Sequence, residues 1–254
     1  MAKKDEIVKT GEDVPSYLKP VEKGAVAEGM ENIRPGDILV PRLVLLQALS
    51  PSVSANKNRA GELINSVTGE VCLENDKSLI FHPVYHYLEW IKWGDRDQGG
   101  GIQERSLDPK GELAQMAFRR EKHQDSQGKD VFTSTEYHNF VALVPALSLE
   151  QAYIISCSKT NLKKAKKLLG LAKFRGGQPL YAGAYSVSTL LETNAKINAK
   201  YYTFEFENAG WIPEELLPLC KKMYETMRDA YQSDSLQAHV EDQDPAGEST
   251  ETEL

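Results

Sequence analysis

Short stretches of alternating apolar and polar residues recur along the chain, and this period of two is typical of half-buried β-strands. Turn signals at Thr68-Gly69 and Pro145-Ala146, and a polar loop around Asn194 and Asn198, divide neighbouring stretches into three hairpins. Pro83 places its strand at a sheet edge or on a bulge, because proline cannot donate to a ladder. The stretches that we expect to form strands are 37–50, 62–73, 78–93, 137–144, 151–157, 185–191 and 200–207. Within the first of these, Leu43 to Leu49 also fits a helical turn.

Two stretches follow the helical period instead. The first begins after Ser158 as N-cap, and Gly176-Gly177 ends it. The second runs from Pro213, a favoured first helical residue, to Tyr231. Their apolar stripes are Leu162, Ala165, Leu169 and Ala172 in the first helix and Leu216, Cys220, Met223 and Met227 in the second. Residues 95–128 are mostly polar and include three consecutive glycines, which predicts a long loop.

These elements predict a mainly β fold with added helices. Short strands in hairpins, one helix between strands and another at the end suit an OB-like Greek-key barrel with insertions and a C-terminal helix. A mixed α+β sandwich is the competing architecture. We expect a flexible N-terminal arm over 1–35, a single domain over 36–232 and a disordered acidic tail over 233–254.

Charge is unevenly distributed along the chain. The net charge is -7, yet residues 159–200 hold nine Lys or Arg and one carboxylate, Glu192. Residues 233–254 hold seven carboxylates and no Lys or Arg. A basic surface followed by an acidic tail suits a polyanionic partner, for which the tail competes. The alternative interpretation is a solvated helix face and a solubilising tail.

Aromatic residues next to cations are the main binding candidates, because single strands need rings for bases and cations for phosphates. In a strand, Tyr85, Tyr87 and Trp93 project from one face and Trp90 from the other. A second aromatic set is interleaved with cations: Phe174, Tyr181, Tyr185, Tyr201 and Tyr202 with Lys173, Arg175, Lys196 and Lys200. The alternative for either set is that the rings fill the core.

Four lysines of the first helix, 163, 164, 166 and 167, are expected opposite its apolar stripe, as a phosphate-contacting ridge or as an ordinary solvated face. We assign phosphate contacts to Lys163, Lys164, Lys167, Lys173, Arg175 and Lys200. We assign base contacts to some of Tyr85, Tyr87, Trp90, Trp93, Tyr185 and Tyr202.

Signals for catalysis and cofactors are weak. His82 and His86 have a metal-ligand spacing only in a helix, and Asp95 and Asp97 lie in a polar loop. No phosphate-loop, nucleophile-elbow or dinucleotide fingerprint occurs. We therefore expect no enzyme, cofactor or metal. Three distant cysteines indicate reduced thiols in the cytoplasm, and no apolar run reaches the ~18 residues of a membrane helix.

The chain resembles the single-stranded DNA-binding proteins of tailed bacteriophages. The resemblance lies in a small β domain with aromatic and basic strands, a C-terminal helix and an acidic tail, HVEDQDPAGESTETEL. It implies an OB-type fold that coats single-stranded DNA and a tail that recruits replication or recombination proteins. The chain ends in Glu-Leu where the best-known tails end in an aromatic residue.

The leading hypothesis is a non-catalytic single-stranded DNA-binding protein of a phage replication or recombination system, for which self-association stays open. The alternative is a phage structural or host-interaction protein that does not bind nucleic acid. A metal-dependent nuclease that uses the Asp95 loop ranks third.

Overall fold

Antiparallel β-strands form most of the regular secondary structure in the computed structural model, which describes residues 40–94, 101–195 and 198–232. All described residues belong to one compact unit. The mainly β fold with a C-terminal helix is therefore confirmed. The arm predicted for 1–35 and the tail predicted for 233–254 lie outside the described residues.

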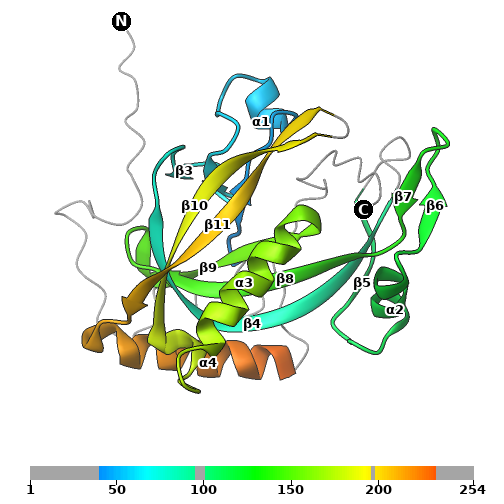
Figure 1. Cartoon of the computed structure of the whole chain (residues 1–254). Coiled ribbons are helices and arrows are strands. Elements are labelled where there is room, and N and C mark those ends of the chain that lie inside the picture. Colours follow the sequence, from blue (N-terminus) through cyan, green and yellow to red (C-terminus); the bar gives the residue numbers. More distant parts are fainter. Residues whose placement is uncertain (1–39, 95–100, 196–197, 233–254) are drawn as a thin grey trace, which may run out of the picture. The chain divides into compact units, whose positions relative to one another are not determined.

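The large sheet has the strand order β11-β10-β4-β8-β9, and β5 pairs with β4 as well (Figure 1). The order of β10, β4, β8 and β9 is that of a Greek key, in which the fourth strand returns beside the first. The strands are β4 (Leu79–Trp93), β5 (Ile102–Ser106), β8 (Thr135–Val144), β9 (Ser148–Ser158), β10 (Gly183–Asn194) and β11 (Ala199–Trp211). Two of the predicted hairpins, β8-β9 and β10-β11, are confirmed.

A smaller sheet, β1-β2-β3, holds the remaining predicted hairpin. Its strands and the short helix after the first of them are β1 (Leu43–Leu45), β2 (Leu63–Asn65), β3 (Val71–Leu73) and α1 (Pro51–Ser54). A parallel bridge joins Arg42 to Ile154 of β9. On the other side, the Gln47 side-chain amide exchanges two 2.9 Å hydrogen bonds with the backbone of Tyr202 in β11.

The Gln47 amide occupies the place where a further strand would pair with the outer edge of β11. No strand pairing among the described residues closes the large sheet into a barrel, and β9 and β11 lie at its two ends. The Greek-key strand order that we expected is therefore present, but the closed OB-like barrel is not observed among the described residues. A side-chain amide and a single bridge link the sheets where a barrel would have continuous ladders.

Strand β4 changes its partner along its length. Its first residues pair with β10, residues 82–91 pair with β8, and residues 90–93 pair with β5. The register shifts between Pro83 and Tyr85, so of the two expected positions for Pro83, a sheet edge or a bulge, the bulge is the one observed.

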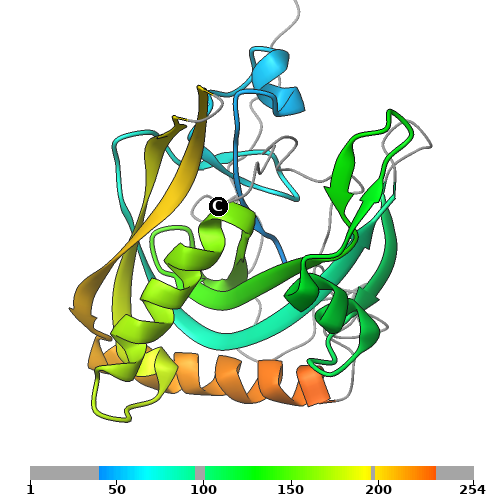
Figure 2. The ribbon, with the colours of Figure 1, turned by 45° about the vertical axis from the view of Figure 1, so that its right-hand side comes forward.

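The large sheet is covered by different helices on its two faces. Side chains alternate between the faces along each strand, so Phe140 and Ile155 lie in one core cluster and Val141 and Ile154 in another. Helix α3 (Leu162–Lys173) contributes Leu168 to the first cluster, which also holds β1–β3. Helix α4 (Leu217–Gln232) covers the second cluster (Figures 1 and 2).

Both long helices were predicted, with differences at their beginnings. The three-residue helix η3 (Lys159–Asn161) separates Ser158 from α3, so Asn161 and not Ser158 precedes the α-helical turn. A similar short helix, η5 (Glu214–Leu216), precedes α4, and η4 (Leu180–Ala182) precedes β10. The predicted apolar stripe of α4 lies in the core cluster on its face of the sheet.

The stretch predicted as a long loop contains three regular elements, and a fourth begins two residues after it. The three are β5, α2 (Glu112–Arg119) and β6 (Lys122–Gln124), and the fourth is β7 (Asp130–Phe132). Leu113 and Ala114 of α2 pack with Trp90 in a small core cluster of their own. A two-turn helix and three-residue strands give too few periodic positions to be recognised without that packing partner.

Candidate nucleic-acid interface

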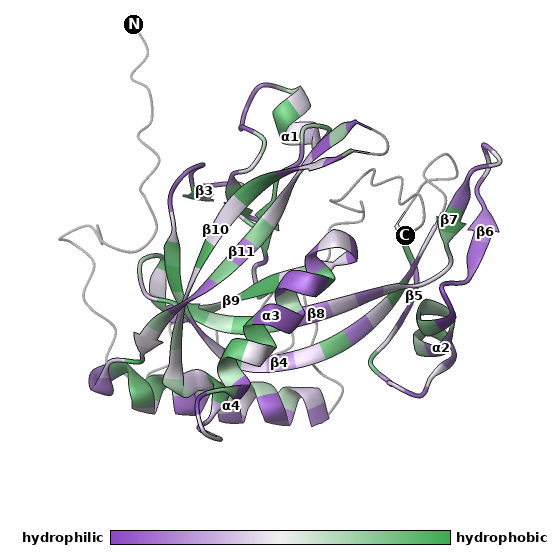
Figure 3. Cartoon of the chain, viewed as in Figure 1, coloured by the Kyte–Doolittle hydropathy of each residue, from purple (hydrophilic) through white to green (hydrophobic). Residues whose placement is uncertain are grey.

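The outward face of α3 carries a row of cations that ends in an aromatic ring. Lys163, Lys167 and Phe174 are separated by intervals of four and seven residues, so they share one face of the helix. Lys166 and Lys173 flank this row, and all five side chains are exposed. Polar and apolar positions alternate along α3 in Figure 3, where the polar ones are purple. Three of the four lysines are therefore exposed, as both a phosphate-contacting ridge and an ordinary solvated face require.

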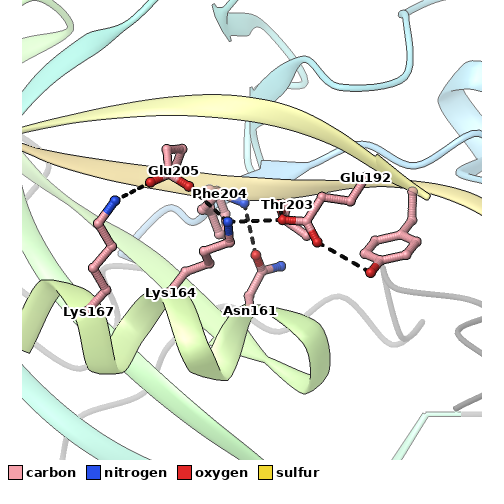
Figure 4. A network of polar contacts seen from close by, with 8 residues as sticks. Asn161, Lys164, Lys167, Glu192, Thr203, Phe204 and Glu205 are labelled. Carbon is pink, nitrogen blue, oxygen red and sulfur yellow. Dashed lines mark hydrogen bonds and ion pairs between the residues drawn. The ribbon is translucent and has the colours of Figure 1, made fainter. Parts of the chain in front are cut away.

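The fourth lysine, Lys164, lies on a different side of α3. Its Nζ is 2.8 Å from Glu205 Oε2 of β11 and 2.9 Å from Glu192 Oε1 of β10 (Figure 4). Lys167 also donates to Glu205. Because Lys164 is already paired with two carboxylates, it is not free to contact phosphate in this structure.

These ion pairs join α3 to the β10-β11 hairpin. Burial raises the pKa of the Glu205 carboxyl, but hydrogen bonds from Lys164 and Lys167 outweigh it and hold that pKa below its usual value. Asn161 adds a neutral contact, since its Oδ1 accepts a 2.9 Å hydrogen bond from the backbone N–H of Phe204. The helix therefore caps part of the outer edge of β11.

Arg175 lies between two aromatic rings just beyond the end of α3. Its guanidinium carbon is 4.8 Å from the ring centroid of Tyr185 and 4.6 Å from that of Trp211. Its Nη2 donates to the carbonyl oxygen of Ala184 at 3.2 Å and to Asn208 Oδ1. Cation–π contacts and fixed hydrogen bonds hold the guanidinium in one orientation.

Two rings at this position are exposed to solvent. Phe174 is 89% exposed and Trp211 is 59% exposed, which is unusual for large apolar side chains. We call Lys173, Phe174, Arg175 and Trp211 the aromatic-basic patch. It continues the lysine row of α3, and it combines exposed rings with cations.

The aromatic run of β4 is mostly core. Tyr87 and Trp90 are 3% and 5% exposed, so no base can stack on them in this structure. The centroid of Tyr231 in α4 lies 5.7 Å from that of Tyr85 and 6.0 Å from that of Tyr87. Tyr85 and Trp93 are half-buried. Helix α4 packs on Tyr85 and Tyr87, and helix α2 packs on Trp90, so Tyr87 and Trp90 are core residues, as in the alternative interpretation.

Of the other residues predicted to contact DNA, the rings of Tyr185 and Tyr202 are packed inside the fold, whereas Lys200 is exposed. Tyr185 is fully buried beneath Arg175, so it supports the patch and offers no surface to a base. The Tyr202 ring packs so closely on Gly61 that a Cβ there would lie 2.4 Å from it. Lys200 is exposed near the turn of the β10-β11 hairpin.

The weak metal candidates do not converge. His82 Nδ1 lies 3.2 Å from the carbonyl oxygen of Gly183, whereas His86 Nε2 lies 3.1 Å from His138 Nδ1. Asp95 and Asp97 fall outside the described residues. Within the part of the chain that the structure describes, no group of three or more His, Cys, Asp or Glu could hold a metal ion.

Comparison with known proteins places the chain in a phage family. A family model described as Pam3 phage gp34-like protein matches residues 8–233. The chain belongs to this family. No curated protein and no solved structure matches it. The expected phage origin is confirmed, and the family description names no DNA-binding activity. Among the described residues, no helix is both long and apolar enough to cross a membrane.

Trp211 is the patch residue that sequence reasoning missed. It follows Gly210 at the end of a strand, outside the stretch where cations and rings are interleaved. The available signal was its position at the strand end, where an aromatic residue has fewer neighbours to bury it. Its contact with Arg175 forms because the end of β11 lies beside the end of α3 in the fold. The spacing of residues along the chain does not predict this contact.

Proposed function

We propose that this phage-family protein binds single-stranded DNA without catalysing a reaction, on the lysine row of α3 and the aromatic-basic patch. The observation that carries the proposal is the exposed ring of Trp211, which the oriented guanidinium of Arg175 contacts, together with the exposed ring of Phe174, the residue before that arginine in the chain. Bases stack on such rings at ~1–3 kcal/mol each, without reading sequence.

The lysine row supplies the complementary charge. Lys163, Lys166 and Lys167 lead to the patch along one helix, so a strand whose bases reach Phe174 and Trp211 can place successive phosphates beside them. A duplex keeps its bases stacked internally and cannot offer their faces to the rings. The arrangement therefore favours single strands.

The proposed setting is phage replication or recombination, where exposed single strands need protection. In this proposal the acidic residues of 233–254 compete with DNA for the basic surface and recruit replication or recombination proteins. This part rests on charge and on the resemblance to phage single-stranded DNA-binding proteins.

Fluorescence anisotropy with labelled single-stranded and duplex oligonucleotides of equal length tests the proposal. We expect single strands of different sequence to bind with similar affinity, and duplex to bind more weakly. The logarithm of the affinity should fall with the logarithm of the salt concentration, with a slope of about −0.7 for each phosphate neutralised. Preference for duplex, or binding that ignores salt, would show that the proposal is wrong.

A further inference from the structure

A charged cluster is buried on the face of the large sheet that α4 covers. Glu89 of β4 is fully buried. Arg42 Nη2 lies 3.4 Å from Glu89 Oε2, and Arg105 Nε donates to Glu89 Oε1. Asn139 Nδ2 donates a 2.8 Å hydrogen bond to Glu89 Oε2. Three separate parts of the chain therefore bring donors to one carboxylate.

The cluster contains more positive than negative charge. The Arg42 and Arg105 side chains are 9% and 26% exposed, and both guanidinium groups bind the same glutamate. Two cations and one anion leave one positive charge without a partner within the cluster. An uncompensated charge is costly to bury, so the arrangement favours one further anion.

Three hydrogen-bond donors of this cluster have no acceptor among the described residues. They are Arg42 Nε, Arg105 Nη2 and the hydroxyl of Tyr87. Each of the three atoms is itself buried, although the Arg105 side chain is 26% exposed as a whole, so bulk water does not satisfy them. Tyr87 lies two residues before Glu89 on the same face of β4. Burial raises the pKa of its hydroxyl, and the positive charges of Arg42 and Arg105 act in the opposite direction.

We propose that Arg42, Arg105 and Tyr87 bind a single oxyanion, of which phosphate is the simplest example. Each available group is a donor, and an oxyanion offers acceptors in several directions together with the missing negative charge. Glu89 holds the two guanidinium groups in place. The site is on the opposite face of the sheet from the first core cluster and α3, so it does not depend on the proposed DNA interface.

Phosphate binding to the full chain tests this site. We expect calorimetric titration, against chloride at equal ionic strength, to detect one phosphate per chain and thermal unfolding to shift upward with phosphate. Tyr87→Phe removes only the hydroxyl and keeps the ring against Tyr231. It should weaken phosphate binding about tenfold, because a hydrogen bond to a charged group is lost.

Tyr85→Phe is the matched control, since Tyr85 lies on the same strand face and also packs against Tyr231. It should leave phosphate binding unchanged. Without phosphate, Tyr87→Phe should unfold at the same or a higher temperature than the natural chain, because a buried unpaired hydroxyl has been removed. If the hydroxyl only stabilises the fold, Tyr87→Phe will lower the unfolding temperature by the same amount with and without phosphate. That result would overturn the proposal.

Free phosphate and the terminal phosphate of a nucleic acid share this chemistry. A 5′-phosphorylated dinucleotide that displaces phosphate, while its unphosphorylated form does not, would identify a strand end as the ligand. Failure of both dinucleotides to displace bound phosphate would identify the free ion. If no single phosphate site is detected in the natural chain, buried water satisfies the three donors and the inference is wrong.

Discussion

The aromatic run of β4 and the aromatic-basic patch look alike as sequence, yet they have opposite environments. In β4, Trp93 follows Lys92, and in the patch Phe174 lies between Lys173 and Arg175, whereas Trp211 joins the patch only through the fold. Trp90 is 5% exposed beneath α2, whereas Trp211 is 59% exposed beside Arg175. The difference lies in whether a later segment of the chain covers the ring.

A covering helix, and not the strand itself, decides which rings are accessible to a partner. Along β4, α4 packs on the rings of Tyr85 and Tyr87 and α2 packs on Trp90. Trp211 lies at the end of the outermost strand, β11, where its ring contacts the guanidinium group of Arg175. An exposed ring held by a cation is preorganised for stacking.

The largest expected effect comes from removing a covered ring. Trp90→Ala should destabilise the fold by ~3–5 kcal/mol, because it leaves a cavity between β4 and α2. Urea unfolding measures the change. In buffer without urea, folded Trp90→Ala should bind single-stranded DNA with the same affinity as the natural chain. A stable variant with weakened DNA binding would place Trp90 at the interface and reverse the comparison.

Removing an exposed ring should have the opposite consequence. Trp211→Ala should weaken binding to single-stranded DNA by ~1–3 kcal/mol and change the unfolding midpoint little, because the ring is largely solvated. Fluorescence anisotropy measures the affinity. Phe118→Ala is the control, since Phe118 is 90% exposed on α2, away from the patch in sequence and on another helix. Equal losses in the two variants would show that exposed rings contribute without regard to position.

A smaller effect is expected at the ion pairs that join α3 to β11. Glu205→Gln should tighten single-stranded DNA binding several-fold at low salt, because Lys167 gains freedom to contact phosphate. Glu207→Gln removes the same charge two residues away on the same strand face, where the side chain is exposed. Identical affinities of the two variants would mean that net charge, and not release of Lys167, controls binding.

The same glutamate makes stability depend on pH. The folded-state pKa of Glu205 is below its ordinary value of 4.5, so its ion pairs stabilise the fold above about that pH. Their contribution should disappear as the pH falls from 4.5 through the lowered pKa. Urea unfolding of the natural chain and of Glu205→Gln should therefore differ at neutral pH and converge in acid. A constant difference across this range would contradict the assignment.

The smallest expected effect concerns residues 233–254. Their deletion should tighten single-stranded DNA binding at low salt, because tethered carboxylates compete with phosphate at high effective concentration. The gain should shrink as salt rises, since charges are screened within about 8 Å at physiological ionic strength. Anisotropy titrations at two salt concentrations measure it. Unchanged affinity at low salt would remove the tail from the proposed competition.

Most of the secondary structure followed from local pattern. The hairpin at Thr68-Gly69, the bulge at Pro83 and the apolar stripe of α4 depend on residues that are close in sequence. The stretch predicted as a long loop contains β5, α2 and β6, because the short helix gains its place only by packing on Trp90, more than twenty residues earlier.

By itself the sequence determined the β-rich class, the hairpins, the two long helices and the concentration of cations on α3, because these depend on local periodicity and charge. Only the tertiary structure decided which rings are buried, that Lys164 is paired while Lys163 is exposed, and that Trp211 meets Arg175. Each of these depends on contacts between segments distant along the chain. Such contacts form when strands and helices bury a shared apolar surface, and the spacing of residues within one segment does not specify them.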